Sequence, residues 1–376
     1  MEKLIRIGMD TSKRVFQLHG VDASEAPVLR RKIGRAAVLG FYKRLPPTVV
    51  AVEACGASHF WAREIAALGH EVRLIAPQLA KPYVKRGKND AADAEALCEA
   101  MSRPTMRFVP VKTADQQAAL MQASMRERLV RERTRLANTI RGHALEFGLA
   151  APTGPAQVAP LLAAVAADLR VPALARELFA GLGEEFADVE RRVAEADARL
   201  RAWHRAGEVS RRLATVPGIG AITAALLAMK VPDPTVFRTA RDFAAWLGLT
   251  PKDHSTAGKT RLGRITRAGD ETVRSLLVVG ATSVIRHARA GTGRHQSAWL
   301  VALLARKPPK LAAVALANKT ARIVWRLLVS GEAYDPGHAA ARVAGGVAGG
   351  VAGGAACGTG MGVGAGAPDY AAPAAA

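Results

Sequence analysis

Short apolar runs separated by turn residues fill the first hundred positions, and this pattern predicts an α/β domain. The expected elements are, in order, a strand at 4–10, its hairpin partner at 14–22, a strand at 48–53, a helix at 59–69, a strand at 70–76 and a helix from residue 90. Two of these strands end in acidic residues, the first in Asp10 and the third in Glu53. The order of elements predicts a mixed sheet covered by helices.

From about residue 114 the apolar positions change to a helical period. Over 128–148 they keep near-heptad spacing, and a second seam alternates steps of three and four through Phe186, Val189, Val193, Ala196, Leu200 and Trp203. Such a seam can pair with the other helix of the same chain or with a second subunit, and the spacing leaves both open. Strong helical patterns continue from 210 to about 331.

These changes of pattern predict four regions. Residues 1–110 form the α/β domain, 111–209 a helical coiled-coil and oligomerisation region, 210–331 a mainly α domain and 332–376 a Gly/Ala-rich tail. The tail repeats VAGG and carries almost no charge or large side chains. Because it cannot offset its own ordering entropy, we expect it to be disordered.

The charge balance points to a nucleic-acid partner. The 376 residues include 53 Lys and Arg against 32 Asp and Glu, a formal net charge of +21. Neutralising phosphates and releasing their counterions supplies most non-specific nucleic-acid affinity. No membrane-spanning run, lipidation signal or signal peptide is evident. The cysteines match no zinc or disulfide pattern, so we expect a cytoplasmic protein.

The stretch KNDAADAEA places acids directly behind a basic loop. Asn89 is a favourable helix N-cap, so Asp90 and Asp93 are expected three residues apart on one face of the following helix. The simpler interpretation is that first-turn acids complement the helix dipole. If the strands ending in Asp10 and Glu53 are parallel neighbours, however, all four carboxylates can meet at one edge of the sheet.

Four carboxylates at one place repel each other unless divalent cations lie between them. Hard oxygen ligands select Mg²⁺ or Mn²⁺, and paired metals stabilise the attacking and leaving oxygens of phosphodiester cleavage. The basic residues Lys85, Arg86 and Lys88 would hold the phosphate backbone beside the acids.

Two motifs of the C-terminal region also fit phosphate binding. VPGIGAITA resembles a helix-hairpin-helix turn, in which Gly218 and Gly220 let backbone N–H groups approach a phosphate, and an ordinary helix–helix turn explains it equally well. The second motif, LGLTPKDHSTAGKTRLGRITRAGD, lacks the glycine spacing of a P-loop.

This second motif reads as a basic loop between two helices, with Ser255 near its centre. The loop could simply bind DNA, with Ser255 donating to a phosphate. Alternatively, Ser255 is a nucleophile that needs deprotonation and nearby cations. The candidate cations are Lys259, Arg261, Arg264 and Arg267.

Several of these motifs occur together and in order: IGMDTSKRVFQLHGVD, VEACGASHFWARE, KNDAADAEA, ATVPGIGAITA, LGLTPKDHSTAGKTRLGRITRAGD and ANKTARIVWRLL. Together they resemble the DEDD-type insertion-sequence transposases, the bridge-RNA-guided recombinase family, which pair a RuvC-like domain with a C-terminal serine-bearing domain. The resemblance runs from about residue 3 to 330.

The resemblance implies an RNase H/RuvC-like N-terminal domain in which Asp10, Glu53, Asp90 and Asp93 bind Mg²⁺. It also implies that Ser255 forms a covalent phosphoserine link to DNA, in a dimer or tetramer that a coiled coil holds together. A structured guide RNA from the element would select the DNA, and the protein would act at the bacterial nucleoid. One departure is in the loop that the family pattern gives as HSTGGK, which reads HSTAGK here, so that Ala257 replaces a glycine. A second departure is the tail, which matches nothing in the family.

Two rival functions remain. A RuvC-like structure-specific endonuclease that uses water as its nucleophile would keep the four acids but not need Ser255. A non-catalytic DNA-binding protein with a degenerate nuclease fold would need neither, and its binding would depend on the basic loops alone.

Overall fold

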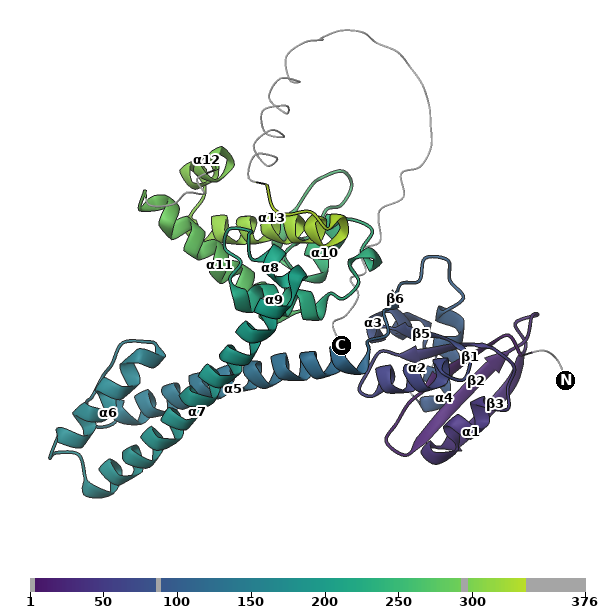
Figure 1. Ribbon diagram of the computed structural model, residues 1–376, viewed down its shortest axis with the longest axis horizontal. Coiled ribbons are helices and arrows are strands. Elements are labelled where there is room, and N and C mark those ends of the chain that lie inside the picture. Colours follow the sequence, from purple (N-terminus) through teal and green to yellow (C-terminus); the bar gives the residue numbers. More distant parts are fainter. Residues whose placement is uncertain (1–3, 86–88, 292–296, 336–376) are drawn as a thin grey trace, which may run out of the picture. The chain divides into compact units, whose positions relative to one another are not determined.

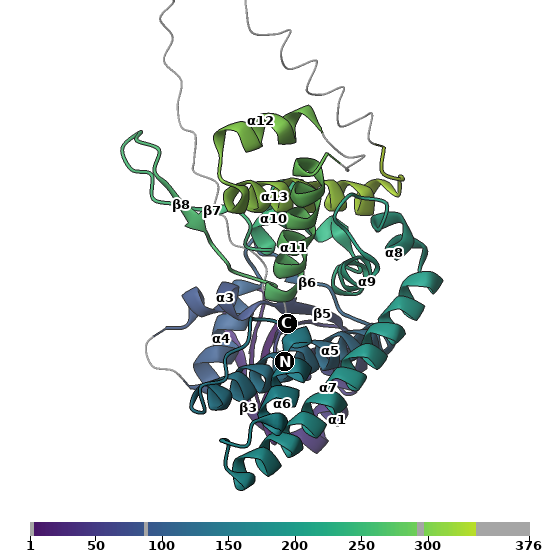
Figure 2. The same cartoon turned by 90° about the vertical axis from the view of Figure 1, so that its left-hand side faces the viewer.

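The computed structural model describes residues 4–85, 89–291 and 297–335 (Figures 1 and 2). By its internal contacts the chain divides into two compact units. One unit comprises Met1–Ala114, Arg212–Ile219 and Val231–Ala376, and the other comprises Asp115–Arg211 and Gly220–Lys230. Arg86, Lys88 and the expected tail from residue 336 onward lie outside the described residues. No helix in the described stretches is long and apolar enough to cross a bilayer.

The N-terminal part of the first unit is a six-stranded mixed sheet with helices, which confirms the predicted α/β class. Its strand order is β3-β2-β1-β4-β5-β6. The central strand β1 pairs antiparallel with β2 and parallel with β4, as the hairpin and parallel-neighbour predictions require. The elements are β1 Arg6–Asp10, β2 Val15–Val21, β3 Pro27–Gly34, η1 Arg35–Ala37, α1 Val38–Tyr42, β4 Val49–Glu53, α2 Ser58–Ala66, β5 Glu71–Ile75, α3 Pro77–Ala80, η2 Lys81–Tyr83, α4 Asp90–Ala100 and β6 Phe108–Val109.

The strand β3 was not predicted. It is an edge strand in which only Ile33 is buried, so its sequence lacks the alternation of a half-buried strand. The helix α1 was also not predicted, because five residues are too few to display a helical period.

The sheet has two buried faces with different cores. One face carries Ile7, Met9, Phe16, Leu18, Val50 and Val52 towards residues of α1 and α2. The opposite face packs Ala51 and Ile75 against Leu97 and Cys98 of α4. Because side chains alternate along a strand, Asp10 and Glu53 project from the face that α4 covers.

The second unit is built on two long helices, α5 Ala114–Leu145 and α7 Ala173–Ala206. Arg126 pairs with Asp197, and Arg133 pairs with Glu190 at 3.1 Å, so the two helices run antiparallel. The seam residues Phe186, Val189, Val193, Ala196 and Leu200 are buried, and Leu129 packs on three of them. The seam therefore packs within one chain, which is one of the two alternatives that the spacing left open. The remaining elements are η3 Pro155–Gln157, α6 Val158–Ala167 and α9 Ala221–Lys230.

The C-terminal part of the first unit is mainly helical, as predicted. Its longest helix, α13, packs against the neighbouring helices α10, α11 and α12, and presents buried small residues such as Ala317 and Ala321. The helix α8 Glu208–Leu213 crosses the boundary between the two units. The other elements are η4 Pro234–Val236, α10 Ala240–Trp246, β7 Pro251–Asp253, β8 Leu262–Ile265, α11 Glu271–Arg289, α12 Ala298–Arg306 and α13 Pro309–Ser330. The motif expected to be a loop is instead the hairpin β7–β8, which projects from these helices in Figure 2.

Candidate active site

The first group of candidate residues lies where two neighbouring parallel strands end. Met9 of β1 is in register with Val52 of β4, and the next residues along the two strands are Asp10 and Glu53. Both are half-buried. The predicted meeting of these carboxylates at one sheet edge therefore follows directly from the register.

Helix α4 brings the other two acids to the same place. It lies on β1 and runs antiparallel to it: the Nε of Arg6 donates to the carbonyl oxygen of Cys98 at 3.1 Å, and Gly8 contacts Ala94. Four helical residues rise about 6 Å and two strand residues about 6.6 Å. The next step along both elements therefore sets Asp90 near Asp10.

The N-terminus of α4 is built as the sequence predicts. The side chain of Asn89 caps the helix by accepting from the backbone N–H of Ala92 at 2.9 Å. Asp90 and Asp93 occupy the first turn, Asp90 exposed and Asp93 half-buried. The dipole contribution of first-turn acids is therefore present as well, but it does not explain the two acids on the sheet.

The electrostatics of Asp10 show that the other three carboxylates act on it. Burial, and then repulsion from Asp90, Asp93 and Glu53 in that order, raises the pKa of Asp10 to about 6 from an ordinary value of 3.8. A carboxyl that resists ionisation beside three others is a group whose charge a bound cation would stabilise.

The four acids have the chemistry that a divalent cation needs, but their side chains are not arranged as a complete coordination site. All supply the hard oxygen atoms that Mg²⁺ and Mn²⁺ prefer. Within the described residues, no three acidic, histidine or cysteine side chains stand close enough together to form a ready-made metal site. The carboxylates would have to turn towards a common point to share an ion.

The basic loop before α4 is described only in part. The Nζ of Lys85 lies 2.7 Å from Glu95 and 3.8 Å from Glu99, so this lysine is held by two carboxylates of α4. These partners raise the pKa of Lys85. Arg86 and Lys88, which we expect to hold phosphate with it, are outside the described residues.

The second group of candidate residues lies on the β7–β8 hairpin. Ser255 is exposed, and its backbone N–H donates to Asp253 at 2.9 Å, while its hydroxyl also donates to that carboxylate. The N–H of Arg261 donates to the Ser255 oxygen at 3.0 Å. The hydrogen bonds from Ser255 lower the pKa of Asp253, which is therefore ionised at neutral pH.

The tip of the hairpin contains the unexpected alanine. Ala257 has φ +46° and Gly258 has φ +78°, both in the left-handed region that favours glycine. Thr256 and Lys259 close the turn through a bridge. The predicted cations Lys259, Arg261, Arg264 and Arg267 are all exposed along this hairpin and the segment after it.

The two glycines of VPGIGAITA have different surroundings. Gly218 has φ +86°, and a Cβ atom there would lie 3.0 Å from the carbonyl oxygen of Gly280 on α11. Its glycine identity therefore has an internal packing reason. Gly220 is exposed and has open space around its Cα, so an approaching phosphate would meet no side chain there.

Two residues important to this geometry were not identified from the sequence. Gly8 lets α4 approach β1. The only local sign of this contact in the sequence is that the residue two positions before Asp10 has no side chain. Asp253 accepts the hydroxyl of Ser255, and its signal is the Asp-x-Ser spacing, which commonly forms a side-chain turn.

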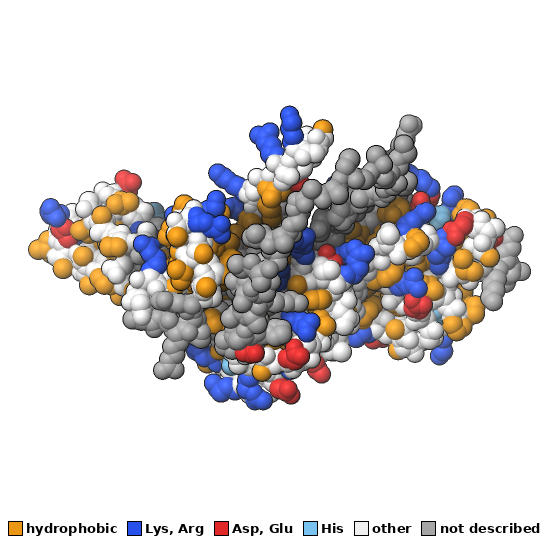
Figure 3. Space-filling model, turned by 90° about the horizontal axis from the view of Figure 1, so that it is seen from above, with side chains coloured by type: hydrophobic (Ala, Val, Ile, Leu, Met, Phe, Trp, Pro, Cys, Tyr) orange, Lys and Arg blue, Asp and Glu red, His pale blue; other side chains and the backbone are white. Residues whose placement is uncertain are grey.

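Positive charge is spread widely over the surface that Figure 3 shows, with acidic side chains between the basic ones. This distribution agrees with the expectation of a polyanionic partner. It does not by itself locate the binding surface.

Two family models match the chain, one on each group of candidate residues. A model of DEDD transposases of IS110, described as a transposase, matches residues 7–147. A model described as Transposase IS116/IS110/IS902 family matches residues 210–296. The first range contains the four acids, and the second contains Ser255.

Curated relatives extend the similarity over nearly the whole chain. The transposase y4pF/y4sB of Sinorhizobium fredii is 62% identical over 92% of this chain and 89% of its own length. The transposase for insertion sequence element IS1328 of Yersinia enterocolitica is 39% identical over 89% of this chain and 99% of its own. The transposase for IS1111A of Coxiella burnetii is 37% identical over 89% and 92%. The chain therefore belongs to the IS110/IS116 family of DEDD transposases.

Proposed function

We propose that this transposase cuts and rejoins the DNA of its insertion sequence with two cooperating groups, the four acids of a RuvC-like domain and the nucleophile Ser255. The observation that carries the proposal is that Asp10 and Glu53 end neighbouring parallel strands beside the first turn of α4, which holds Asp90 and Asp93. Burial, and then repulsion from these three acids, raises the pKa of Asp10. Asp10, Glu53, Asp90 and Asp93 would hold Mg²⁺ or Mn²⁺. When bound, the metal would stabilise negative charge on the reacting phosphate.

The hydrogen bonds around Ser255 suit a nucleophile. In the cleavage step the Ser255 oxygen would bond to phosphorus while the bond from phosphorus to the departing strand breaks. The hydroxyl proton would pass to the ionised Asp253, and the departing oxygen would take a proton from water. A free DNA hydroxyl later attacks the phosphoserine, which rejoins the strand and releases Ser255.

The basic hairpin supports the same assignment. Lys259, Arg261, Arg264 and Arg267 would bind the phosphates on either side of the bond under attack, and Gly220 would let a backbone N–H approach another. A guide RNA, a partner implied by the family resemblance alone, would select the DNA sequence. The charge of +21 favours polyanionic partners but does not distinguish RNA from DNA.

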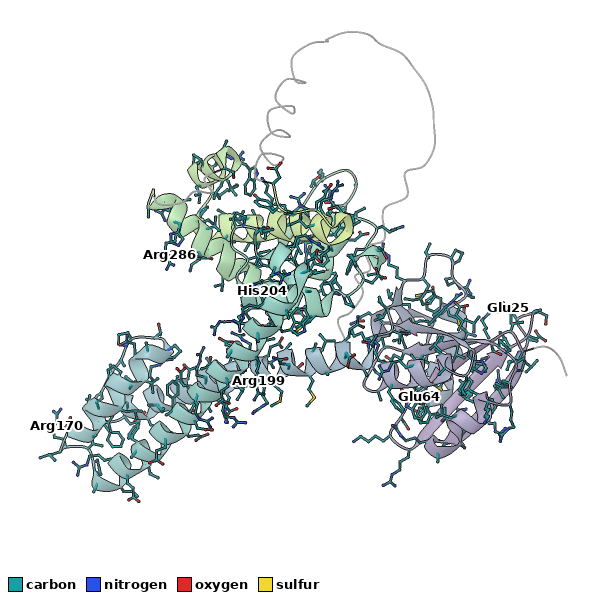
Figure 4. All side chains as sticks on the ribbon, viewed as in Figure 1. Glu25, Glu64, Arg170, Arg199, His204 and Arg286 are labelled. Atoms are coloured by element: carbon teal, nitrogen blue, oxygen red, sulfur yellow. The ribbon has the colours of Figure 1, made fainter. Side chains whose placement is uncertain are left out.

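A second subunit would complete the assembly as a homo-oligomer. The second unit offers a groove of about 490 Å³ beside the α5–α7 seam, lined by Met121, Met125 and Leu129 of α5 and by Arg192 and Arg199 of α7. Arg199 is labelled on α7 in Figure 4. Met121 is 67% exposed, which makes this groove the surface that we favour for contact between subunits.

A search for a covalent protein–DNA adduct tests the proposal. The protein would be incubated with Mg²⁺, DNA of its element's end and RNA transcribed from the element's non-coding region, and then separated under denaturing conditions. We expect an adduct that disappears in both Ser255→Ala and Asp90→Asn. Cleavage that survives Ser255→Ala but not Asp90→Asn would instead establish the water-using endonuclease. DNA binding without cleavage in any condition would support the non-catalytic alternative.

A further inference from the structure

A row of residues leads from the acid cluster to the outer edge of the sheet. Asp10 lies directly opposite Gln17 on β2, and Gln17 lies directly opposite Lys32 on β3. Directly opposite residues project from the same face, so Lys32 shares the face of Asp10. With strands about 4.8 Å apart, the two Cα positions are separated by about 10 Å.

Two further cations stand at the same end of the sheet. Lys13 and Arg14 belong to the β1–β2 turn, which begins immediately after Asp10. The turn is ordered by Ser12, whose hydroxyl oxygen accepts from the N–H of Val15 at 3.2 Å. The carbonyl oxygen of Arg14 also accepts from the N–H of Arg35 at 2.8 Å, which joins the turn to the end of β3.

These three cations are exposed and have no carboxylate partner among the described residues. The ion pairs of the described chain include neither Lys13, Arg14 nor Lys32. Arg6 and Lys85 of the same domain differ, since Arg6 pairs with Glu25 and Lys85 pairs with Glu95. The positive charge beside the acids is therefore available to an anion from outside the protein.

We propose that Lys32, Lys13 and Arg14 form a phosphate-binding row, which holds the DNA strand on one side of the cut site. The inference rests on the proposed function of the four acids, because these would hold the phosphate that is cut. A separation of about 10 Å along the sheet end corresponds to a few nucleotides of the same strand. Lysine on an edge strand can also serve only to prevent pairing between sheets, but that role does not explain Lys13 and Arg14 in a turn.

Salt-dependent binding tests the row. The full chain would be titrated with a fluorescent duplex of its element's end, with EDTA present to prevent cleavage, over a range of salt concentrations. Each lost phosphate contact lowers the slope of log K against log salt by about 0.9. For the triple variant Lys13→Gln, Arg14→Gln, Lys32→Gln we expect the magnitude of this slope to be smaller than in the wild type by about 2 to 3. The matched control is Lys43→Gln, an exposed lysine between α1 and β4 and hence at the opposite end of β4 from Glu53.

A neutral phosphate analogue then locates the contact. One methylphosphonate would be placed at each position near the cut, and binding compared between the wild type and Lys32→Gln. We expect one position, a few nucleotides from the cut, to weaken wild-type binding several-fold and to have no further effect on the variant. The proposal would be overturned if the triple variant kept the wild-type slope of log K against log salt. It would also be overturned if every methylphosphonate weakened binding by Lys32→Gln as much as binding by the wild type. A changed slope for element RNA but not for DNA would overturn the assignment to DNA.

The two proposals fail in different ways. If Asp10→Asn abolishes cleavage while the triple variant binds and cuts normally, the acid site stands and the row does not. If Asp10→Asn leaves cleavage intact, the proposed function fails whatever the salt slope shows.

Discussion

A Cβ atom on Gly8 would lie 2.1 Å from the carbonyl oxygen of Ala94 and 2.5 Å from the backbone nitrogen of Cys98. No side chain fits between β1 and α4 at this point, so the helix backbone lies directly on the strand. This contact determines how far Asp90 and Asp93 stand from Asp10, because Asp10 follows Gly8 on β1 and the other two acids precede Ala94 on α4.

Replacing Gly8 by Ala should therefore damage stability and activity together. The added methyl group must push α4 away, and overpacking of this kind costs about 1–3 kcal/mol. Chemical denaturation would measure the loss of unfolding free energy, and DNA cleavage with Mg²⁺ would measure the displaced acids. Gly40→Ala is the control, since Gly40 lies in α1 with nothing within 4 Å and should gain up to about 1 kcal/mol. Equal effects of both substitutions would contradict this account.

Asp10 makes metal-free stability depend on pH. Its pKa of about 6 exceeds the ordinary 3.8, so the folded chain binds the proton more tightly than the unfolded chain does. The wild type should then lose stability, relative to Asp10→Asn, as pH rises from about 4 to about 6, with no further change above that range. Unfolding free energies of both proteins in EDTA would show this difference.

Mg²⁺ should reverse the destabilisation at neutral pH in the wild type and have little effect on Asp10→Asn. The opposite result would be a wild type that loses stability relative to Asp10→Asn as pH falls. It would mean that Asp10 is stabilised as an anion by partners other than metal. That result would remove the physical basis of the proposed metal site.

Asp253 should matter through the proton of Ser255. Asp253→Asn keeps an oxygen that can accept from the Ser255 N–H but removes the base, and general bases contribute about 10²- to 10⁴-fold. We expect adduct formation to slow by at least about 10²-fold while DNA binding is retained. Asp233→Asn is a matched control, because Asp233 accepts from the N–H and hydroxyl of Thr235 in the same way. Equal rates for the two variants would assign Asp253 a structural role only.

Ala257→Gly should stabilise the tip of the hairpin. Ala257 has φ +46°, and L-residues other than glycine pay roughly 1–2 kcal/mol in this region, partly offset by the greater freedom of glycine in the unfolded chain. The Lys259 N–H, which donates to the carbonyl of Thr256 at 2.9 Å, should exchange with solvent more slowly in the variant. Faster exchange would show that the turn accommodates alanine without strain.

Local patterns in the sequence determined much of this protein. The ends of β1 and β4, the cap at Asn89 and the buried seam of α7 all follow from period, composition and capping, which act within a few residues. The edge strand β3 escaped prediction because its exposed side chains carry no such pattern.

Only the tertiary structure decided which distant residues meet. The close approach of Gly8 and Ala94, the intrachain pairing of α5 with α7 and the row from Asp10 to Lys32 each join segments that are far apart in the chain. Which strand neighbours which, and which helix covers them, depends on packing over the whole domain. The hydrophobic period of each element does not specify which other elements become its neighbours.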